Sequence, residues 1–477
     1  MEYETVIGLE VHVHLKTKTK AFCGCSTEFG QEPNTQTCPV CLGMPGSLPV
    51  LNKVALEYAF KVALALNCSV QEFTKFDRKN YFYPDLPKNY QISQYDLPLA
   101  REGFLDVQTS DADKHIGILR VHLEEDAGKL VHKDDVTLVD FNRAGIPLLE
   151  IVSKPQIYSP EEAYAYLLAL KSVIGYLGVS DCDMEKGSLR CDANISLRKR
   201  GVEELGVKAE IKNLNSFKAV KDALSFEAVR QEGLLREGSP VVQETRLWDA
   251  REGKTISMRS KEEAKDYRYF PEPDLPPFLI KKETIEAIRQ SIPELPREKC
   301  SRFMKEYGLP QYDAQILTVS RATAEYAEEC LRQSQGVNKK IISNWLIGPV
   351  SAGANNRNCG IADLGLSAAL LIELVQAVET QQISHLTGKS VLEEMLRTSK
   401  SSGLIIKEKN LGQVSDTDSL KDEVEAVIKD NQKSVNDFIS GKENALMFLV
   451  GQVMKRTKGK ANPKVVQDTL RRRLTDA

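Results

Sequence analysis

The feature that most constrains the fold of this chain is a set of four short segments in which apolar and polar residues alternate strictly. A period of two is the pattern of a β-strand with one buried face and one polar face. The four segments are residues 6–15, 118–124, 188–198 and 207–212. They predict a sheet in the N-terminal part of the chain, whose apolar side, including Leu119 and Val207, faces the core.

The polar sides of these segments carry residues that can bind metals and phosphates. Glu10, Glu124, Asp192 and Glu210 offer hard oxygen ligands, and His12 is a possible nitrogen ligand. Arg120 and Arg190 alternate with them and can each donate two parallel hydrogen bonds to a phosphate. Since Mg²⁺ is usually held by one or two carboxylates and substrate phosphates, this face suits a Mg²⁺–ATP site. The alternative is an ordinary solvated face, which is the simpler explanation for any single strand.

Two further carboxylates stand beside these strands. Glu125 follows Glu124 with the opposite parity, so a β-bulge is needed to bring it to the same face. Glu150 ends the segment 140–150, in which Asp, Asn and Arg residues surround a turn-forming glycine and proline. This segment is either the edge of a site or an ordinary turn with an asparagine cap.

Four of the ten cysteines form two close pairs separated by a loop of twelve residues. They are Cys23, Cys25, Cys38 and Cys41. This spacing is typical of a zinc site with four thiolate ligands, and such a site has a structural role because no coordination position stays open. The scattered cysteines are expected to be small core residues.

The composition excludes a membrane protein. No apolar run approaches the ~20 residues that a membrane-spanning helix needs. The first fifteen residues lack the basic start and the apolar stretch of an export signal. The sequence therefore predicts a cytoplasmic protein with no membrane contact.

The net charge of −3 hides a basic C-terminal end. Between Gly451 and Arg473 there are eight Lys and Arg residues and one acidic residue, Asp468. This bias favours a module that binds nucleic acid through phosphate contacts, with a solvated helix face as the alternative. Residues 78–91 combine aromatic, basic and amide side chains in a proline-rich loop, and residues 265–273 have a similar composition. These stretches could stack a nucleotide base or pack against a partner.

Other patterns divide the chain. Residues 52–66 and 160–177 have helical spacing, and proline-rich stretches at 271–277 and 292–296 predict a linker. Helices are then expected over residues 297–307, 313–334, 338–348, 364–379 and 384–399. A break at 401–403 and a polar loop at 412–419 precede a last helical region, in which Asn462 and Pro463 form a helix start.

Long stretches of this sequence resemble the B subunits of the tRNA-dependent amidotransferases, the GatB/GatE family. The similar stretches are residues 7–15, 23–50, 79–94, 122–129, 139–153, 190–197, 210–217 and 453–463. The most diagnostic is VDFNRAGIPLLE, residues 139–150. The resemblance extends over essentially the whole chain.

The resemblance implies an α+β fold with three domains. Residues 1–293 would form a glutamine-synthetase-like antiparallel β cradle, the catalytic domain, with a zinc knuckle at residues 23–41. An α-helical domain would follow over residues 294–407, and a small YqeY-like helical tail domain that binds tRNA over residues 408–477.

The resemblance also implies an activity. ATP would phosphorylate the side-chain carboxylate of Glu-tRNA(Gln) or Asp-tRNA(Asn), and ammonia would then displace the phosphate to leave the amide. The ammonia would come from glutamine hydrolysed by the amidase (A) subunit, a glutaminase, and the small (C) subunit would bind both chains. The protein would thus be a ligase that forms carbon–nitrogen bonds as part of a heterotrimer, with ATP, Mg²⁺ and Zn²⁺ as cofactors.

The resemblance also implies functional roles for the polar residues. Mg²⁺ ligands are assigned to Glu10, His12, Glu124, Glu125, Glu150, Asp192 and Glu210. Nucleotide binding is assigned to Arg120, Arg190, Lys212 and Asn194. The catalytic set is Glu10, His12, Glu125, Glu150 and Arg190. Lys79 and Lys88 are assigned to the passage by which ammonia arrives.

Two alternatives remain at the level of the sequence. One is a non-catalytic, zinc-containing tRNA-binding scaffold, in which the polar strand faces are merely solvated. The other is a free-standing ligase like glutamine synthetase, which would act on free glutamate without tRNA.

Overall fold

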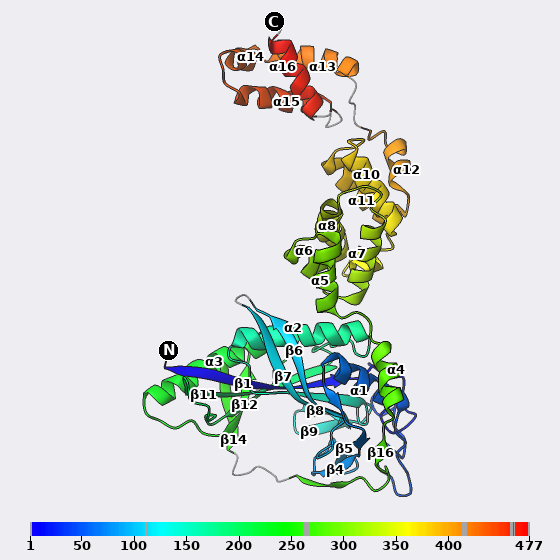
Figure 1. Ribbon diagram of the computed structural model, residues 1–477, viewed down its shortest axis with the longest axis vertical. Helices are drawn as coiled ribbons and strands as arrows, with labels where there is room; N and C mark the ends of the chain where they lie inside the picture. The colour runs from blue at the N-terminus through cyan, green and yellow to red at the C-terminus, as the bar shows by residue number, and fades with distance from the viewer. Residues whose placement is uncertain are drawn as a thin grey trace. The chain divides into compact units, whose positions relative to one another are not determined.

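The computed structural model describes residues 2–109, 112–260, 267–412, 417–457, 461 and 463–475 (Figure 1). The chain divides into two compact units, Met1–Leu295 and Pro296–Ala477. Strands are confined to the first unit among the elements of these residues, and helices occur in both. The predicted α+β class is therefore confirmed.

The first unit is built on a nine-stranded sheet, counted over the described residues, in the order β14-β13-β12-β11-β1-β10-β7-β6-β2. Its strands are β1 (Tyr3–His14), β2 (Ser69–Val70), β6 (Ala100–Gln108), β7 (Asp113–Glu125), β10 (Pro147–Ser153), β11 (Leu189–Lys199), β12 (Ala209–Lys212), β13 (Glu244–Asp249) and β14 (Lys254–Ser260). Neighbouring strands are antiparallel, except that β12 and β13 run parallel.

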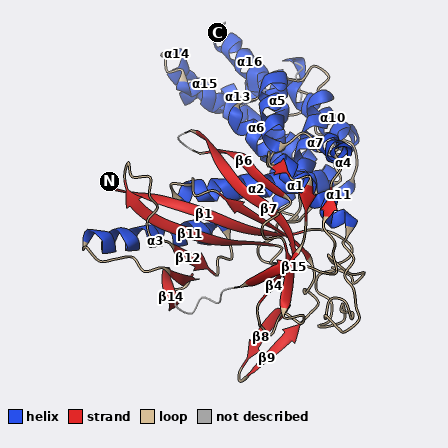
Figure 2. Ribbon diagram, turned by 60° about the horizontal axis from the view of Figure 1, so that its bottom comes forward, coloured by secondary structure: helices blue, strands red, loops and turns tan. Residues whose placement is uncertain are grey.

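Helices cover the apolar face of this sheet. They are α1 (Lys53–Ala65), α2 (Pro160–Leu177) and α3 (Phe217–Arg236), and Figure 2 shows α2 and α3 lying along the strands. The core joins alternate residues of β1, such as Leu9 and Val11, to apolar helix residues such as Leu167. The helices predicted at 52–66 and 160–177 are confirmed. Ser159 caps the second by accepting a hydrogen bond from the Glu162 amide.

The alternation is confirmed in β1 and β11 but fails at two positions. Leu119 is 40% exposed because the pairing of β7 with β10 is irregular there: Val152 lies opposite Arg120 and Ser153 opposite Ile118. The extra residue moves Leu119 off the apolar face. Val207 is also exposed, because it precedes the first residue of β12.

Within the described residues, three small sheets accompany the main one. They pair β15 (Arg268–Pro271) with β4 (Asp77–Asn80) and β5 (Tyr90–Ser93), β16 (Phe278–Leu279) with β3 (Phe73–Thr74), and β8 (Lys129–Lys133) with β9 (Val136–Asp140). The prediction of a linker at 271–277 was wrong, since this stretch joins β15 to β16 and both strands pair inside the first unit. After α4 (Lys282–Gln290), the boundary falls at the second proline-rich stretch, between Leu295 and Pro296.

The second unit is helical. Its α-helices in the described residues are α5 (Pro296–Tyr307), α6 (Gln311–Leu317), α7 (Arg321–Arg332), α8 (Lys339–Trp345), α9 (Ser351–Asn355), α10 (Ala368–Glu379), α11 (His385–Thr398), α12 (Ser402–Glu408), α13 (Thr417–Asp430), α14 (Gln432–Ile439), α15 (Asn444–Arg456) and α16 (Pro463–Thr475). Two hydrophobic clusters form, one between Phe303 and Ile406 and one between Leu420 and Leu474. The division into three domains, with a boundary near residue 407, stays a prediction.

Local capping explains where the helices depart from the predictions. The helix expected at 313–334 is two helices, because Ser320 begins α7 by capping the Thr323 amide. The break expected at 401–403 is the start of α12, where Ser401 caps the Leu404 amide. Residues 413–416 of the expected polar loop, residues 265–266 of the second aromatic stretch and Asn462 lie outside the described residues. No helix of the part that the structure describes is long and apolar enough to cross a membrane.

Candidate functional site

Four strands of the main sheet bring their polar residues into one row. His12 on β1 lies opposite Glu150 on β10 and opposite Arg190 on β11. Glu150 in turn lies opposite His122 on β7. Because alternate residues of a strand point to the same face, Glu10 and Glu124 extend this row on either side. In the sequence β1 ends at His14, whereas β7, β10 and β11 begin at Asp113, Pro147 and Leu189, so only the sheet register brings β1 to the other three strands.

The side chains of this row form a carboxylate–imidazole cluster, made of Glu10, His12, His122, Glu124 and Glu150. The Nε2 atom of His12 lies 3.5 Å from Glu150 Oε2, 3.7 Å from Glu10 Oε1 and 3.8 Å from Glu124 Oε1. The Nε2 atom of His122 lies 3.4 Å from Glu150 Oε2 and 3.5 Å from Glu124 Oε2. Glu150 thus belongs to two groups of possible metal ligands, one with Glu10 and His12 and one with His122 and Glu124.

The pKa values in the cluster are shifted in the way expected of a site that can bind a cation. Burial would raise the pKa of Glu150, but His122 and His12 hold it well below its usual range. Burial likewise opposes the charge of His122, but Glu150 and Glu124 raise its pKa to about 9. Burial and the neighbouring Glu150 raise the pKa of Glu10.

The donor set of the cluster fits a hard divalent cation. In each of the two groups the ligand atoms lie within 4.8 Å of one another. Carboxylate oxygens with an imidazole nitrogen are ligands that such a cation accepts. Without a metal ion, the two imidazoles can offset only part of the charge of the three carboxylates, and a bound metal ion would take over this role.

Three cations lie around the cluster, each attached to a carboxylate and partly exposed. Arg120 Nη2 lies 3.3 Å from Glu150 Oε1. Lys212 Nζ lies 2.9 Å from Asp192 Oδ2 and 3.1 Å from Glu210 Oε1.

Asp192 and Glu210 are therefore engaged with Lys212 and belong to neither metal group. Asn194 lies further along β11, opposite Glu210. The third cation, Arg190, is held by an aspartate described below.

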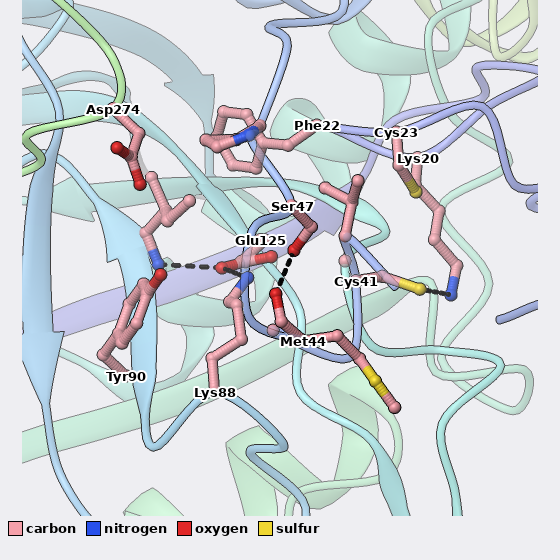
Figure 3. Close-up of a pocket in the computed structure, with 15 residues that line it drawn as sticks. Lys20, Phe22, Cys23, Cys41, Met44, Ser47, Lys88, Tyr90, Glu125 and Asp274 are labelled. Atoms are coloured by element: carbon pink, nitrogen blue, oxygen red, sulfur yellow. Dashed lines mark hydrogen bonds and ion pairs between the residues drawn. The ribbon is translucent and has the colours of Figure 1, made fainter. Parts of the chain in front are cut away.

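Glu125 lies apart from the cluster. Its carboxylate pairs with the Lys88 ammonium and accepts a hydrogen bond of 2.9 Å from the Ile92 amide. These groups line a cavity of about 60 Å³ that also reaches Lys20 and Cys41 (Figure 3). The bulge of β7 is at Leu119, too early to change the side on which Glu125 emerges relative to Glu124.

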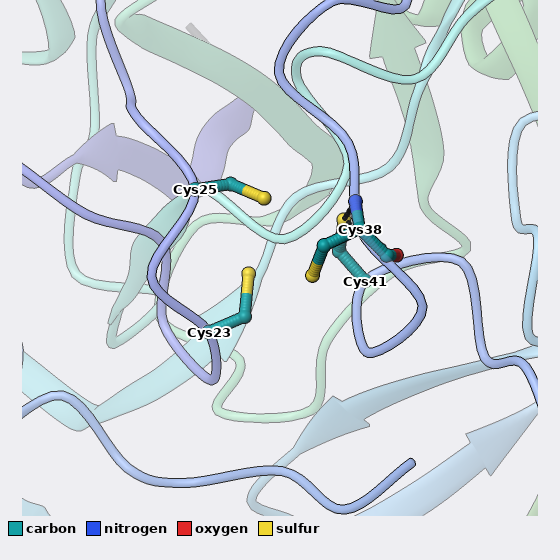
Figure 4. Close-up of side chains that lie close together, drawn as sticks. All are labelled: Cys23, Cys25, Cys38 and Cys41. Atoms are coloured by element: carbon teal, nitrogen blue, oxygen red, sulfur yellow. Dashed lines mark hydrogen bonds between the residues drawn. The ribbon is translucent and has the colours of Figure 1, made fainter. Parts of the chain in front are cut away.

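The four cysteines of the predicted zinc site converge. The Sγ atoms of Cys23, Cys25, Cys38 and Cys41 all lie within 4.8 Å of one another (Figure 4). A hydrogen bond from Cys23, the Cys38 amide and the nearby Lys20 ammonium lower the pKa of Cys41 to about 4. Four sulfur atoms at these separations fit a tetrahedral zinc ion with Zn–S bonds of about 2.3 Å.

Comparison with known proteins adds to this geometry. The model of the GatB/GatE catalytic domain matches residues 5–286, and a second model, the GatB domain, matches residues 325–474. The chain belongs to the GatB/GatE family. It is 54% identical over 476 residues to the B subunit of the aspartyl/glutamyl-tRNA(Asn/Gln) amidotransferase of Caldanaerobacter subterraneus, with 100% of both chains covered. The B subunit from Carboxydothermus hydrogenoformans is 54% identical over 99% of both chains. That of Persephonella marina is 53% identical over 98% of this chain and 99% of its own.

One residue that sequence reasoning missed organises the edge of the site in this GatB/GatE chain. Asp126 is buried, and its carboxylate lies 2.6 Å from His14 Nε2, 2.8 Å from Arg190 Nη2 and 3.3 Å from Arg143 Nε. Burial would raise the pKa of Asp126, but Arg190 and His14 hold this pKa well below its usual range. Asp126 follows the end of β7, so strand periodicity carried no signal for it.

His122 was also missed as a member of the site. In β7, His122 lies two residues from Glu124 and so on the same face of the strand. This pattern could have identified His122 from the sequence. Its Nδ1 atom is buried and has no hydrogen-bond partner, which is costly unless the ring has another use.

The diagnostic segment of the GatB/GatE resemblance has a structural role here. Asp140 Oδ1 accepts a hydrogen bond from the Asn34 amide, and Asn142 Oδ1 accepts one from the Gln36 amide. The segment therefore fixes the loop between the two cysteine pairs. Gly145 has φ +87°, and a Cβ there would lie 3.3 Å from Lys20 Cδ, so this turn favours glycine.

Proposed function

We propose that this chain is the part of a tRNA-dependent amidotransferase that phosphorylates and amidates the side-chain carboxylate of Glu-tRNA(Gln) or Asp-tRNA(Asn). Support comes from family membership along the whole chain and from the names of its relatives. The observation that carries the proposal is the carboxylate–imidazole cluster with Arg120, Arg190 and Lys212 around it.

The chemistry has two steps. A carboxylate oxygen of the substrate attacks the γ-phosphorus of ATP, ADP leaves, and an acyl phosphate forms. Ammonia then attacks the acyl carbon, phosphate leaves with the bonding electron pair, and the nitrogen loses one proton, so that the neutral amide remains. A carboxylate is a poor electrophile, and the first step supplies the good leaving group that the second step needs.

The residues of this chain would serve the first step mainly by position and charge. Mg²⁺ bound by Glu10, His12, Glu124 and Glu150 would neutralise charge on the transferred phosphoryl group. Arg190 and Lys212 would donate hydrogen bonds to the phosphate oxygens of ATP. Asp126 keeps the Arg190 guanidinium oriented while leaving it partly exposed.

Burial argues against the scaffold alternative. His122, Glu124 and Glu150 are 4%, 3% and 7% exposed, although a solvated face would leave them in water. Charged groups that are buried together cost free energy and persist in sites where their interactions are used.

The nitrogen would come from partners. The amidase (A) subunit would hydrolyse glutamine, and the small (C) subunit would bind both chains. The cavity at Glu125 and Lys88 is of a size to hold small polar molecules such as water or ammonia, so we assign these two residues to the ammonia passage. Lys79, which was expected from the resemblance to share this role, does not line the cavity.

Reconstitution tests the proposed function. The chain is combined with the amidase and the small third subunit, and amide formation is measured on each misacylated tRNA with ATP, Mg²⁺ and glutamine. Amide should form on at least one tRNA and should require both ATP and this chain. Activity on free glutamate without tRNA would instead support the free-standing ligase.

Zinc is proposed to stabilise the cysteine loop without taking part in the reaction. In Cys41→Ser we expect zinc content to fall below one ion per chain and the free energy of unfolding of the first unit to fall by several kcal/mol. Metal analysis and thermal unfolding measure both quantities. Cys300→Ser, a change in α5 of the second unit, should leave both unchanged. Full zinc content in Cys41→Ser would contradict the four-cysteine site.

The tail is proposed to bind tRNA. Arg456 pairs with Glu423 and Asp430, and Arg473 pairs with Glu425, so part of the positive charge is already neutralised within the tail. Lys455 and Arg472 lie near the ends of α15 and α16 and are the residues that we assign to phosphate contacts.

Removal of residues 412–477 should therefore raise the KM for aminoacyl-tRNA about ten-fold or more, while the KM for ATP stays the same. Steady-state kinetics of the complete complex measure both constants. A KM for tRNA equal to that of the full-length chain would contradict the role of the tail.

A further inference from the structure

Four tyrosines, which we call the tyrosine cluster, gather on the small sheet of β15, β4 and β5. They are Tyr81, Tyr95, Tyr267 and Tyr269. Tyr269 lies opposite Lys79 across the β15–β4 pair, so both side chains are on one face of the small sheet. The other three tyrosines lie just beyond the ends of the three strands.

The rings of the tyrosine cluster pack on one another and around a cation. The ring centroids of Tyr95 and Tyr269 are 4.1 Å apart with an interplanar angle of 14°, and those of Tyr81 and Tyr267 are 5.5 Å apart. Lys79 Nζ lies 4.8 Å from the centroid of Tyr267. Tyr95 and Tyr267 are nevertheless 59% and 48% exposed, more than core aromatic residues would be.

The tyrosine cluster lies close to the carboxylate–imidazole cluster. Ser93, at the end of β5, donates a hydrogen bond of 3.0 Å to Glu124 Oε2. Burial lowers the pKa of Lys79, but Glu124 and Glu150 raise it above its usual value. The aromatic rings and the carboxylates therefore border the same region.

Exposed aromatic rings beside a cation are the chemistry that recognises a nucleobase and its adjacent phosphate. Bases stack on such rings, and lysine pairs with the phosphate. Aromatic packing on a partner protein would not by itself require a lysine beside the rings, as Lys79 is beside Tyr267.

We propose that the tyrosine cluster binds the terminal adenosine of the substrate tRNA. The base would stack on the exposed rings of Tyr95 and Tyr267, and Lys79 would contact the phosphate on the 5′ side of that nucleotide. This inference rests on the proposed function, because it requires the substrate carboxylate to reach the carboxylate–imidazole cluster.

Geometry favours this adenosine over the adenine of ATP. The amino acid is esterified to the ribose of the terminal adenosine. When its side-chain carboxylate lies at the carboxylate–imidazole cluster, only the ribose and the short amino-acid side chain separate the base from the cluster. The base of ATP is separated from the reacting phosphorus by three phosphates and a ribose. Arg190 and Lys212 could bind those phosphates. They lie on β11 and β12, and in the strand order β10 and β1 separate these two strands from β7.

The test compares two tRNAs on the complete complex. Binding is measured for deacylated tRNA(Gln) with its terminal adenosine and for the same tRNA without it. With the unaltered chain, loss of the adenosine should weaken binding roughly 5- to 100-fold. In Tyr95→Leu and in Tyr267→Leu, the complete tRNA should bind as weakly as the shortened one, and the shortened one should bind as before. Tyr95→Phe should restore the difference because it keeps the ring.

The controls distinguish an adenosine site from a general loss of tRNA binding and from a site for ATP. Tyr312→Leu, at an exposed tyrosine of α6, should behave like the unaltered chain. Equal weakening of both tRNAs, or no weakening in either leucine variant, overturns the proposal. A raised KM for ATP with unchanged tRNA binding also overturns it and assigns the tyrosines to the adenine of ATP.

The binding assay needs no catalysis, so it can succeed or fail independently of the reaction. If the complex made no amide but still distinguished the two tRNAs, the proposed function would fail and the adenosine site would stand.

Discussion

Replacement of Glu150 by glutamine should lower amide formation about a thousand-fold or more, while glutamine hydrolysis by the amidase continues. Glu150 contacts both imidazoles of the carboxylate–imidazole cluster and belongs to both groups of possible metal ligands. The replacement would remove one negatively charged ligand from either of these two groups. The loss of several kcal/mol of transition-state stabilisation corresponds to this factor, since each ~1.36 kcal/mol is ten-fold in rate.

The measurement separates the steps. Amide formation and tRNA-dependent ATP hydrolysis should fall together in Glu150→Gln, because both need the phosphoryl transfer. Glu161→Gln changes an exposed glutamate at the start of α2 and should leave both rates unchanged. If Glu150→Gln made amide at the rate of the unaltered enzyme, the cluster would not be the site of activation.

Replacement of Asp126 by asparagine should affect both stability and turnover. The Asp126 carboxylate compensates His14, Arg143 and Arg190 at a buried position. Removal of one partner from a fully buried ion pair costs about 3–5 kcal/mol. Because Arg143 and Arg190 are partly exposed to solvent, we expect a smaller loss of about 1–3 kcal/mol here. Chemical denaturation of the chain measures this loss.

The loss of the Asp126 carboxylate should also lower turnover, because it affects Arg190. In Asp126→Asn the guanidinium loses its 2.8 Å partner, so we expect a higher KM for ATP together with a lower kcat. Arg190→Lys should reproduce the kinetic defect with a smaller loss of stability, because His14 and Arg143 keep their contacts with Asp126. Unchanged ATP kinetics in both variants would remove Arg190 from nucleotide binding.

Periodicity predicted which side chains share the polar face of the sheet, because strand parity is a local property. In β1 and β7 the side of the sheet on which His12 and Glu124 emerge follows from their position relative to buried neighbours. The proximity of these residues to Glu150 depends on the register between β1, β10 and β7, which no single segment encodes.

The points at which the structure departs from the predicted pattern have equally physical causes. Leu119 left the apolar face because one irregular pair shifts the parity of a strand. Asp192 and Glu210 have the expected parity, but their engagement with Lys212 depends on which strands are neighbours. Asp126 lies after a strand, where alternation no longer applies, and only the three-dimensional turn brings it to Arg190.

The central position of β1 affects how the chain can be made. Residues 3–14 pair on one side with residues 148–152 and on the other with residues 189–199. β1 is therefore synthesised well over a hundred residues before either of its neighbours exists. Contacts of such high contact order form slowly, and an unpaired apolar strand is prone to aggregate in the meantime. A nascent chain that ends before Leu189 lacks β11 and leaves one edge of β1 unpaired, so this stage of synthesis is the one at which aggregation through β1 is most favoured.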